Sequence, residues 1–159
     1  MTEINRIDTL RRIVDGKRSL PGGVLPVLHE IQDACGHIPD EAVPLISAAF
    51  NLSRAEVHGV ISFYHWFREH PAGRHTVRLC RAEACQARGA EALAAHAKAV
   101  LGCDFHETSG DGGITLEPVY CLGQCACGPA LMVDDERLEV RVTAESFNDL
   151  VEGLREVAP

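Results

Sequence analysis

Several features that define common functional classes are missing from this sequence. It has no run of about 18 apolar residues, so we expect no membrane-spanning helix. Its first residues interleave charged and apolar side chains without an apolar block of roughly 7 to 15 residues, so we expect no secretory signal and a cytoplasmic location. The formal net charge is −8 and the Lys and Arg residues do not cluster, which argues against nucleic-acid binding.

Motifs of familiar catalytic sites are missing as well. No Gly-x-Gly-x-x-Gly joins a predicted strand to a helix, and no Walker motif, His-Glu-x-x-His or Ser-His-Asp pattern occurs. No cysteines have the Cys-x-x-Cys spacing of thiol-exchange proteins. None of the eight His residues lies inside a cysteine segment, which argues against a Rieske centre. We therefore expect no substrate site on this chain, so any redox chemistry depends on a partner.

The first part of the chain predicts a small helical bundle. Apolar side chains recur at helical spacing over residues 3–68. The pattern separates into four helices, at residues 4–16, 24–35, 40–50 and 53–64. Ser53 and Glu56 have the spacing of a capping box at the start of the fourth. The segment "REHPAGRHT" then breaks the helical pattern with Pro and Gly, so we expect a helical domain over 1–72 and a second domain over 73–159.

The second part of the chain alternates predicted strands and helices. The strand patterns cover 75–80, 114–121 and a hairpin at 130–142, and the helix patterns cover 86–102 and 143–157. This β-α-β-β-α order is that of a thioredoxin-like α/β layer. Two of its strands end on a cysteine, Cys80 and Cys121, so the sheet should deliver both to one end. The predicted fold class is α+β, a helical bundle followed by a thioredoxin-like domain.

Seven cysteines in a chain without a secretory signal favour metal or thiol chemistry over disulfides. Cys80 and Cys85 are separated by four residues, and Cys121 and Cys125 by three. Two short chelating loops from distant parts of the chain can enclose a metal centre with four thiolates. The spacing suits a [2Fe–2S] cluster and structural zinc alike. Buried thiols without a metal are the simpler alternative, because free Cys is among the most buried residue types.

Three cysteines remain outside this set. Cys35 lies on the apolar face of a predicted helix and Cys103 follows a helix end, so we expect core or loop packing for both. Cys127 could replace Cys125 as a ligand. We favour Cys125, because the longer loop closes around a metal and Gly123 can adopt a positive φ that points backbone N–H groups at sulfur.

These motifs resemble a known family. "ISFYHWFREHPAGRHTVRLCRAEAC", "TLEPVYCLGQCACGPALMVDDE" and "LHEIQDACGHIPDEAV" look like the thioredoxin-like [2Fe–2S] subunit of NAD-linked complexes, over nearly the whole chain. Such subunits occur in respiratory complex I, in NAD-reducing hydrogenases and in NAD-dependent molybdenum formate dehydrogenases. The resemblance implies one [2Fe–2S] cluster, and it places Cys127 outside the ligand set. The ligands that it implies are Cys80, Cys85, Cys121 and Cys125.

Within that family, "CRAEACQ" and "PVYCLGQCACGPALMVD" resemble most the gamma subunit of soluble NAD-dependent formate dehydrogenase. The complex I loop usually has an Ala-Pro where Gly128 here precedes Pro129. The resemblance implies a non-catalytic electron-transfer subunit. Its expected partners are a beta-type flavoprotein subunit with FMN and the NAD site, and a larger molybdenum and iron–sulfur subunit. The alternatives are the equivalent subunit of complex I (NADH-quinone oxidoreductase) or of a hydrogenase and, from another class, a structural zinc module.

Charged and aromatic residues near the cysteines could tune the cluster or contact a partner subunit. Arg81 or Arg88 would raise a cluster's reduction potential if directed inward, and Glu83 would lower it. Exposure to solvent is the simpler expectation for all three. The aromatic run 63–67 is most simply helix core, yet its members cannot all share one helical face. We therefore expect part of it to contact the flavoprotein subunit.

Overall fold

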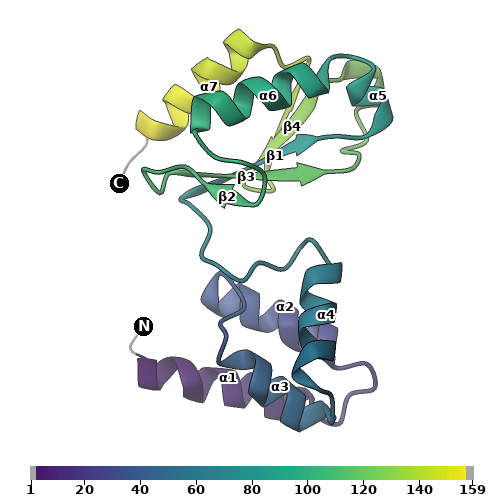
Figure 1. Ribbon diagram of the computed structural model, residues 1–159, viewed down its shortest axis with the longest axis vertical. Helices are drawn as coiled ribbons and strands as arrows, with labels where there is room; N and C mark the ends of the chain where they lie inside the picture. Colours follow the sequence, from purple (N-terminus) through teal and green to yellow (C-terminus); the bar gives the residue numbers. More distant parts are fainter. Residues whose placement is uncertain (1–2, 157–159) are drawn as a thin grey trace. The chain divides into compact units, whose positions relative to one another are not determined.

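The computed structural model describes residues 3–156, with side chains from residue 6 onward. The side chain of Ile4 and the expected last residue of the final helix, Val157, lie outside that part. The chain divides into two compact units, Met1–Pro71 and Ala72–Pro159 (Figure 1). Within residues 3–156, no helix combines the length and the apolar character needed to cross a membrane.

The first unit contains the four predicted helices. They are α1 (Glu3–Lys17), α2 (Val24–Cys35), α3 (Ala42–Phe50) and α4 (Arg54–Phe63). Their apolar stripes meet in one core, in which Leu10, Leu28 and Ile46 are fully buried. The predicted capping box is confirmed: the Ser53 hydroxyl accepts from the backbone N–H of Glu56, and the Glu56 carboxylate accepts from the N–H of Ser53 at 2.7 Å.

The second unit is a mixed sheet with helices packed on it. Its elements are β1 (His75–Cys80), α5 (Glu83–Gln86), α6 (Ala90–Leu101), β2 (Glu107–Thr108), β3 (Ile114–Val119), β4 (Ala130–Val133), β5 (Arg137–Val140) and α7 (Ala144–Glu156). The strand order is β2-β3-β1-β4-β5, with β1 and β3 parallel and the other pairs antiparallel. With the helical unit before it, this confirms the predicted α+β fold class.

Three details differ from the sequence prediction, each because of short-range geometry. The helix α5 has four residues and the strand β2 has two, which is too short for either to show a hydrophobic period. The strand β3 ends at Val119 rather than at Cys121. Cys121 has φ +91°, outside the extended region, so the chain must leave the sheet before it.

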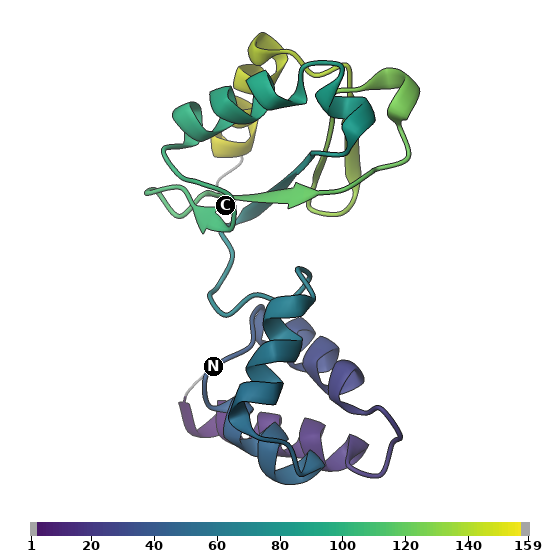
Figure 2. The same ribbon diagram turned by 45° about the vertical axis from the view of Figure 1, so that its right-hand side comes forward.

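The sheet core and the parallel pair of strands place the cysteine loops. The helices α6 and α7 lie side by side on one face of the sheet (Figures 1 and 2), and Phe147 of α7 packs there with Leu79, Leu116 and Leu131. The parallel register pairs Cys80 of β1 with Val119 of β3. Both strands therefore end at the same edge of the sheet, and the loops after them start side by side, as the sequence predicts.

Candidate metal centre

Four cysteines from the two strand-end loops come together at this edge. Cys80 ends β1 and Cys85 lies on α5; we call these two the inner pair. Cys121 follows β3 and Cys125 begins a short 3₁₀ turn; we call these two the outer pair. Electrostatic interactions connect the pairs, since Cys85 interacts with Cys80 and Cys125, and Cys125 also interacts with Cys121 and Cys80. The structure thus gathers all four of the predicted ligand residues.

The inner pair lies inside the protein. Cys80 is 2% exposed and Cys85 is 3% exposed. They share a small apolar cluster with Ala90 and Ala130, against which Leu122 packs from the second loop. This environment keeps water away from the two sulfur atoms. A metal ligand there is held in place by its surroundings before any metal arrives.

Hydrogen bonds to sulfur favour the thiolate form of Cys80. Burial alone raises the pKa of this thiol. The backbone N–H groups of Ala82, Cys121 and Leu122 and the thiol of Cys85 outweigh burial, so the pKa of Cys80 is lowered from its ordinary value. Burial, followed by the shared hydrogen bond with Cys80, raises the pKa of Cys85. Since the thiolate is the form that binds metals, the loop after β3 prepares Cys80 as a ligand.

The outer pair is exposed, and the geometry of its loop keeps it in position. The Sγ atoms of Cys121 and Cys125 are 3.7 Å apart. That is close to the separation of two thiolates on one tetrahedral metal with metal–sulfur bonds of about 2.3 Å. Gly123 has φ +77°, and its N–H donates to the Cys121 sulfur at 3.4 Å, which confirms the role predicted for this glycine. The hydrogen bond with Cys121 raises the pKa of Cys125.

Gly128, whose meaning the sequence does not reveal, lies against the inner pair. A Cβ atom at this position would be 3.1 Å from Cys85 Sγ and 3.2 Å from Arg88 Cδ. Both distances are shorter than ordinary van der Waals contacts, and Gly128 itself has an unstrained φ of −66°. The glycine therefore allows a close approach to a sulfur atom, and a side chain here would require its neighbours to shift by a few tenths of an ångström. The same distances place the stem of Arg88 and the sulfur of Cys85 near the same glycine.

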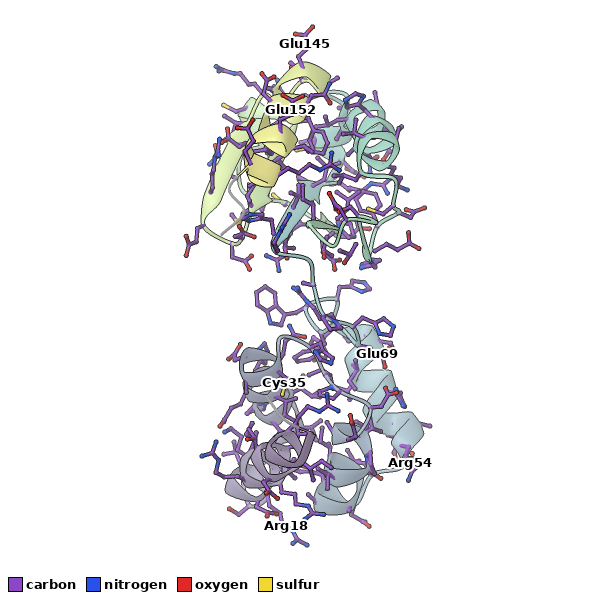
Figure 3. The ribbon with its side chains drawn as sticks, turned by 90° about the vertical axis from the view of Figure 1, so that its left-hand side faces the viewer. Arg18, Cys35, Arg54, Glu69, Glu145 and Glu152 are labelled. Carbon is purple, nitrogen blue, oxygen red and sulfur yellow. The ribbon has the colours of Figure 1, made fainter. Side chains whose placement is uncertain are left out.

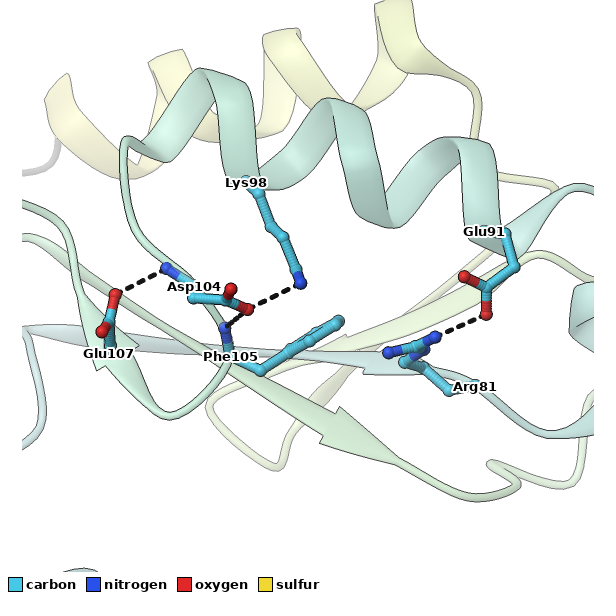
Figure 4. Close-up of polar contacts among 6 residues, drawn as sticks. All are labelled: Arg81, Glu91, Lys98, Asp104, Phe105 and Glu107. Carbon is cyan, nitrogen blue, oxygen red and sulfur yellow. Dashed lines mark hydrogen bonds and ion pairs between the residues drawn. The ribbon is translucent and has the colours of Figure 1, made fainter.

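The two arginines near the cysteines have different surroundings. Arg81 pairs with Glu91 of α6 at 2.5 Å, and its guanidinium lies over the ring of Phe105, 5.1 Å from the centroid (Figure 4). Lys98 approaches the same ring and pairs with Asp104. Arg81 is therefore bound to α6 and the loop after it. Arg88 and Glu83 are both exposed, as the simpler expectation predicts, although the stem of Arg88 lies close to Gly128 near the inner pair.

The three remaining cysteines have other surroundings. Cys35 lies among the helices of the first unit (Figure 3) and packs on their core, and Cys103 packs on the sheet core, as predicted for both. Burial raises the pKa of each thiol. Cys127 is half-buried and contacts Arg141: its carbonyl accepts from the Arg141 N–H at 2.8 Å, and Arg141 Nη2 is 4.0 Å from its sulfur. Sequence reasoning missed this contact.

The donor set fits an iron–sulfur cluster. A [2Fe–2S] cluster distributes four cysteine sulfurs over two irons. The inner and outer pairs match that division, and backbone N–H groups point at sulfur in both loops. The residues that would hold the cluster are Cys80, Cys85, Cys121 and Cys125.

Known proteins resemble this chain over most of its length. It is 37% identical, over 112 residues, to a component of the NADH-quinone oxidoreductase of Pseudomonas aeruginosa, covering 70% of this chain and 68% of the relative. It is 31% identical to HndA, a component of the NADP-reducing hydrogenase of Solidesulfovibrio fructosivorans, covering 79% and 75%.

Among solved structures, an NAD⁺-reducing [NiFe]-hydrogenase in the air-oxidised state shares the fold. The TM-score is 0.68 at 24% identity, over 90% of this chain and 24% of the hydrogenase chain. This chain thus spans about a quarter of that protein. The family model described as "Thioredoxin-like [2Fe-2S] ferredoxin" matches residues 10–155. The chain, with its two cysteine pairs at the ends of parallel strands, belongs to the thioredoxin-like [2Fe–2S] ferredoxin family.

Proposed function

We propose that this protein is the [2Fe–2S] electron-transfer subunit of a multi-subunit oxidoreductase of the NADH-quinone oxidoreductase or NAD-reducing hydrogenase type. The observation that carries the proposal is the convergence of the inner and outer cysteine pairs at one sheet edge in a chain of this family. The similar proteins from Pseudomonas aeruginosa and Solidesulfovibrio fructosivorans are named as subunits of such enzymes. The chain contributes a redox centre, and the oxidation of substrate takes place on other subunits.

The protein side chains and backbone set the properties of the proposed site. When bound, the cluster accepts and releases one electron. The apolar contacts of the inner pair exclude water, and the N–H groups that donate to Cys80 and Cys121 stabilise negative charge on sulfur. The positive charge of Arg88, whose stem borders Cys85, favours the more negative reduced state. The hydrogen bonds and the positive charge raise the reduction potential, whereas the apolar surroundings of the inner pair oppose the added electron and lower it.

The proposal includes a flavoprotein partner that binds FMN and NAD. An exposed aromatic patch on the helical unit is a suitable contact for it. Phe63 is 74% exposed, Tyr64 43% and Trp66 45%, whereas Phe67 of the same run is buried. Aromatic side chains are enriched at the centres of protein interfaces. Replacing Phe63 with Ser should reduce recovery of the flavoprotein subunit with this chain, while the Arg54→Gln substitution at the other end of α4 should not.

A narrower assignment, to the gamma subunit of a formate dehydrogenase, rests on the residues of the two cysteine loops. Gly128 before Pro129 distinguishes the second loop from the usual complex I sequence, and a Cβ at this position would be 3.1 Å from Cys85 Sγ. The test is the activity of the native assembly that co-purifies with this chain. Reduction of NAD⁺ by formate supports the narrower assignment. Activity with hydrogen or quinone and none with formate excludes it.

The spectrum of the anaerobically purified chain tests the cluster itself. A [2Fe–2S] protein is brown, absorbs visible light and gives an EPR signal on reduction by one electron. A structural zinc module, the alternative from another class, is colourless and contains one zinc per chain. Metal and sulfide analysis of the same sample decides between them. Two irons and two sulfides per chain support the proposal, and stoichiometric zinc without iron rejects it.

A further inference from the structure

A second pocket lies next to the cysteine loops, between the beginnings of the two long helices of the sheet unit. Its volume is about 340 Å³. Gly89 and Ala92 line it from the start of α6, Ala144 from the start of α7, and Gly128 and Pro129 from the segment that follows the outer pair. Its size is at the low end of the range of small-molecule pockets. It shares Gly128 with the surroundings of Cys85.

The lining of this pocket is positively charged. Arg88 and Arg141 both line it, and no carboxylate does. The contrast with the rest of the chain is clear, because the net charge is −8 and three other surface pockets each contain Asp or Glu. The first turns of α6 and α7 each carry one Glu, but Glu91 pairs with Arg81 (Figure 4) and Glu145 points away from the body of its unit (Figure 3).

Both arginines are exposed to solvent. None of the ion pairs between described residues includes Arg88 or Arg141. The stem of Arg88 packs beside Gly128, and Arg141 Nη2 has a weak contact with the Cys127 sulfur. Guanidinium groups present forked donors that match phosphate and carboxylate oxygens. Two exposed arginines therefore line the pocket, and none of the carboxylates of the described residues lines it or pairs with them.

We propose that this pocket binds the phosphate group of a small molecule, held between Arg88 and Arg141. Phosphate fits better than a single carboxylate, because it has enough oxygens to engage two guanidinium groups at once. The pocket is also lined by residues at the N-terminal ends of α6 and α7, whose helix dipoles favour an anion. A free phosphate and the phosphate of a nucleotide share this chemistry, and titration with each separates them.

Binding here would act on the neighbouring redox centre, a consequence that rests on the proposed function. The bound anion adds negative charge next to Arg88, whose stem borders the ligand residue Cys85. The reduced cluster carries one more negative charge than the oxidised cluster, so it should bind phosphate more weakly, by about tenfold. A tenfold difference corresponds to a potential lowered by about 59 mV for a one-electron couple. The phosphate-bound protein would thus be harder to reduce.

Calorimetric titration of the full-length chain with inorganic phosphate, and separately with AMP, tests the pocket without requiring a cluster. Arg88→Gln and Arg141→Gln should each weaken binding at least tenfold. The control Arg54→Gln removes the same charge from an exposed position on the helical unit (Figure 3) and should leave binding unchanged. Tighter binding of AMP than of phosphate identifies a nucleotide as the source, and equal binding identifies free phosphate.

Other results would overturn the phosphate pocket or its coupling to the cluster. Absence of saturable binding by either probe, or equal loss in all three variants, overturns the phosphate pocket. A pocket that binds acetate but neither phosphate probe also overturns it, in favour of a carboxylate ligand. A titration of the cluster potential with and without phosphate tests the coupling separately. Phosphate binding with an unchanged potential rejects the coupling. An anaerobically purified chain that contains stoichiometric zinc and no iron rejects the proposed function, and phosphate binding by that same chain still supports the pocket.

Discussion

The two cysteine pairs supply the same chemical group from opposite environments. The inner pair is nearly inaccessible to solvent and is surrounded by apolar side chains, with four hydrogen bonds directed at Cys80. The outer pair is exposed, and the N–H of Gly123 and the sulfur–sulfur contact hold its loop in place. The inner pair is therefore part of the folded core, while the outer pair belongs to a surface loop. In a metal centre built this way, packing fixes the inner pair before the metal binds, and metal binding fixes the outer pair.

The largest expected effect of breaking this arrangement is loss of the cluster. Cys85→Ser and Cys125→Ser should each abolish or strongly perturb the visible and EPR spectra, because each removes a ligand. The pairs should differ in the apoprotein. A hydroxyl at position 85 is buried, so Cys85→Ser should lower the free energy of unfolding by about 1–3 kcal/mol. Cys125→Ser should leave it unchanged, as measured by urea denaturation.

Cys127→Ser is the matched control for this experiment. It changes the same atoms two residues from Cys125, but its sulfur contacts Arg141. The spectrum of this variant should be that of the original protein. A variant at Cys127 that loses the cluster, together with one at Cys125 that keeps it, would reverse the ligand assignment.

Chemical modification of the apoprotein should also separate the two pairs. Iodoacetamide should alkylate Cys121 and Cys125 at least tenfold faster than Cys80 and Cys85, because exposure to the reagent differs so strongly. Time-resolved peptide mass spectrometry measures the four rates. Loading the cluster should protect all four thiols and leave Cys127 reactive. Equal rates within the apoprotein would mean that the inner pair is not held by its packing.

A methyl group at Gly128 should disturb the inner pair without touching the outer one. The added Cβ of Gly128→Ala would crowd Cys85 Sγ at 3.1 Å, and overpacking of this kind costs about 1–3 kcal/mol. We expect lower cluster content and lower stability, measured by iron analysis and by denaturation. Gly110→Ala is the control, since nothing lies within 4 Å of its added Cβ. If the two variants have equal cluster content and equal stability, the close approach to Cys85 does not explain the glycine at position 128.

The smallest expected effect is on the outer loop. Gly123→Ala meets no neighbouring atoms, but φ +77° is unfavourable for a residue with a side chain, at a cost of about 1 kcal/mol. The cluster should still form, and its loss on dilution or chelation should be faster. Chelator-driven bleaching followed at a visible wavelength measures this rate. A slower bleaching rate than that of the original protein would contradict the role of Gly123.

The elements that the sequence predicts are those with long periodic patterns or specific end signals. The four helices of the first unit, the capping box at Ser53 and the two strands that lead to cysteines follow from such patterns. Contacts between residues that are far apart in the sequence have no such sequence pattern. The closeness of Gly128 to Cys85 and the contact of Arg141 with Cys127 depend on how loops fold onto one another. The sequence shows that Arg81 and Arg88 lie near cysteines along the chain. Only the folded structure shows which residues surround each of them.

The parallel pairing of β1 with β3 has a consequence for the order in which the protein matures. Cys80 and Val119 are register partners although two helices and a short strand separate them along the chain. Parallel pairing of distant segments forms late in folding, because closing such a loop is entropically unfavourable. The four thiols therefore do not meet in the unfolded chain. Cluster insertion must follow folding, with the donor meeting a finished surface on which Cys121 and Cys125 are the first thiols within reach.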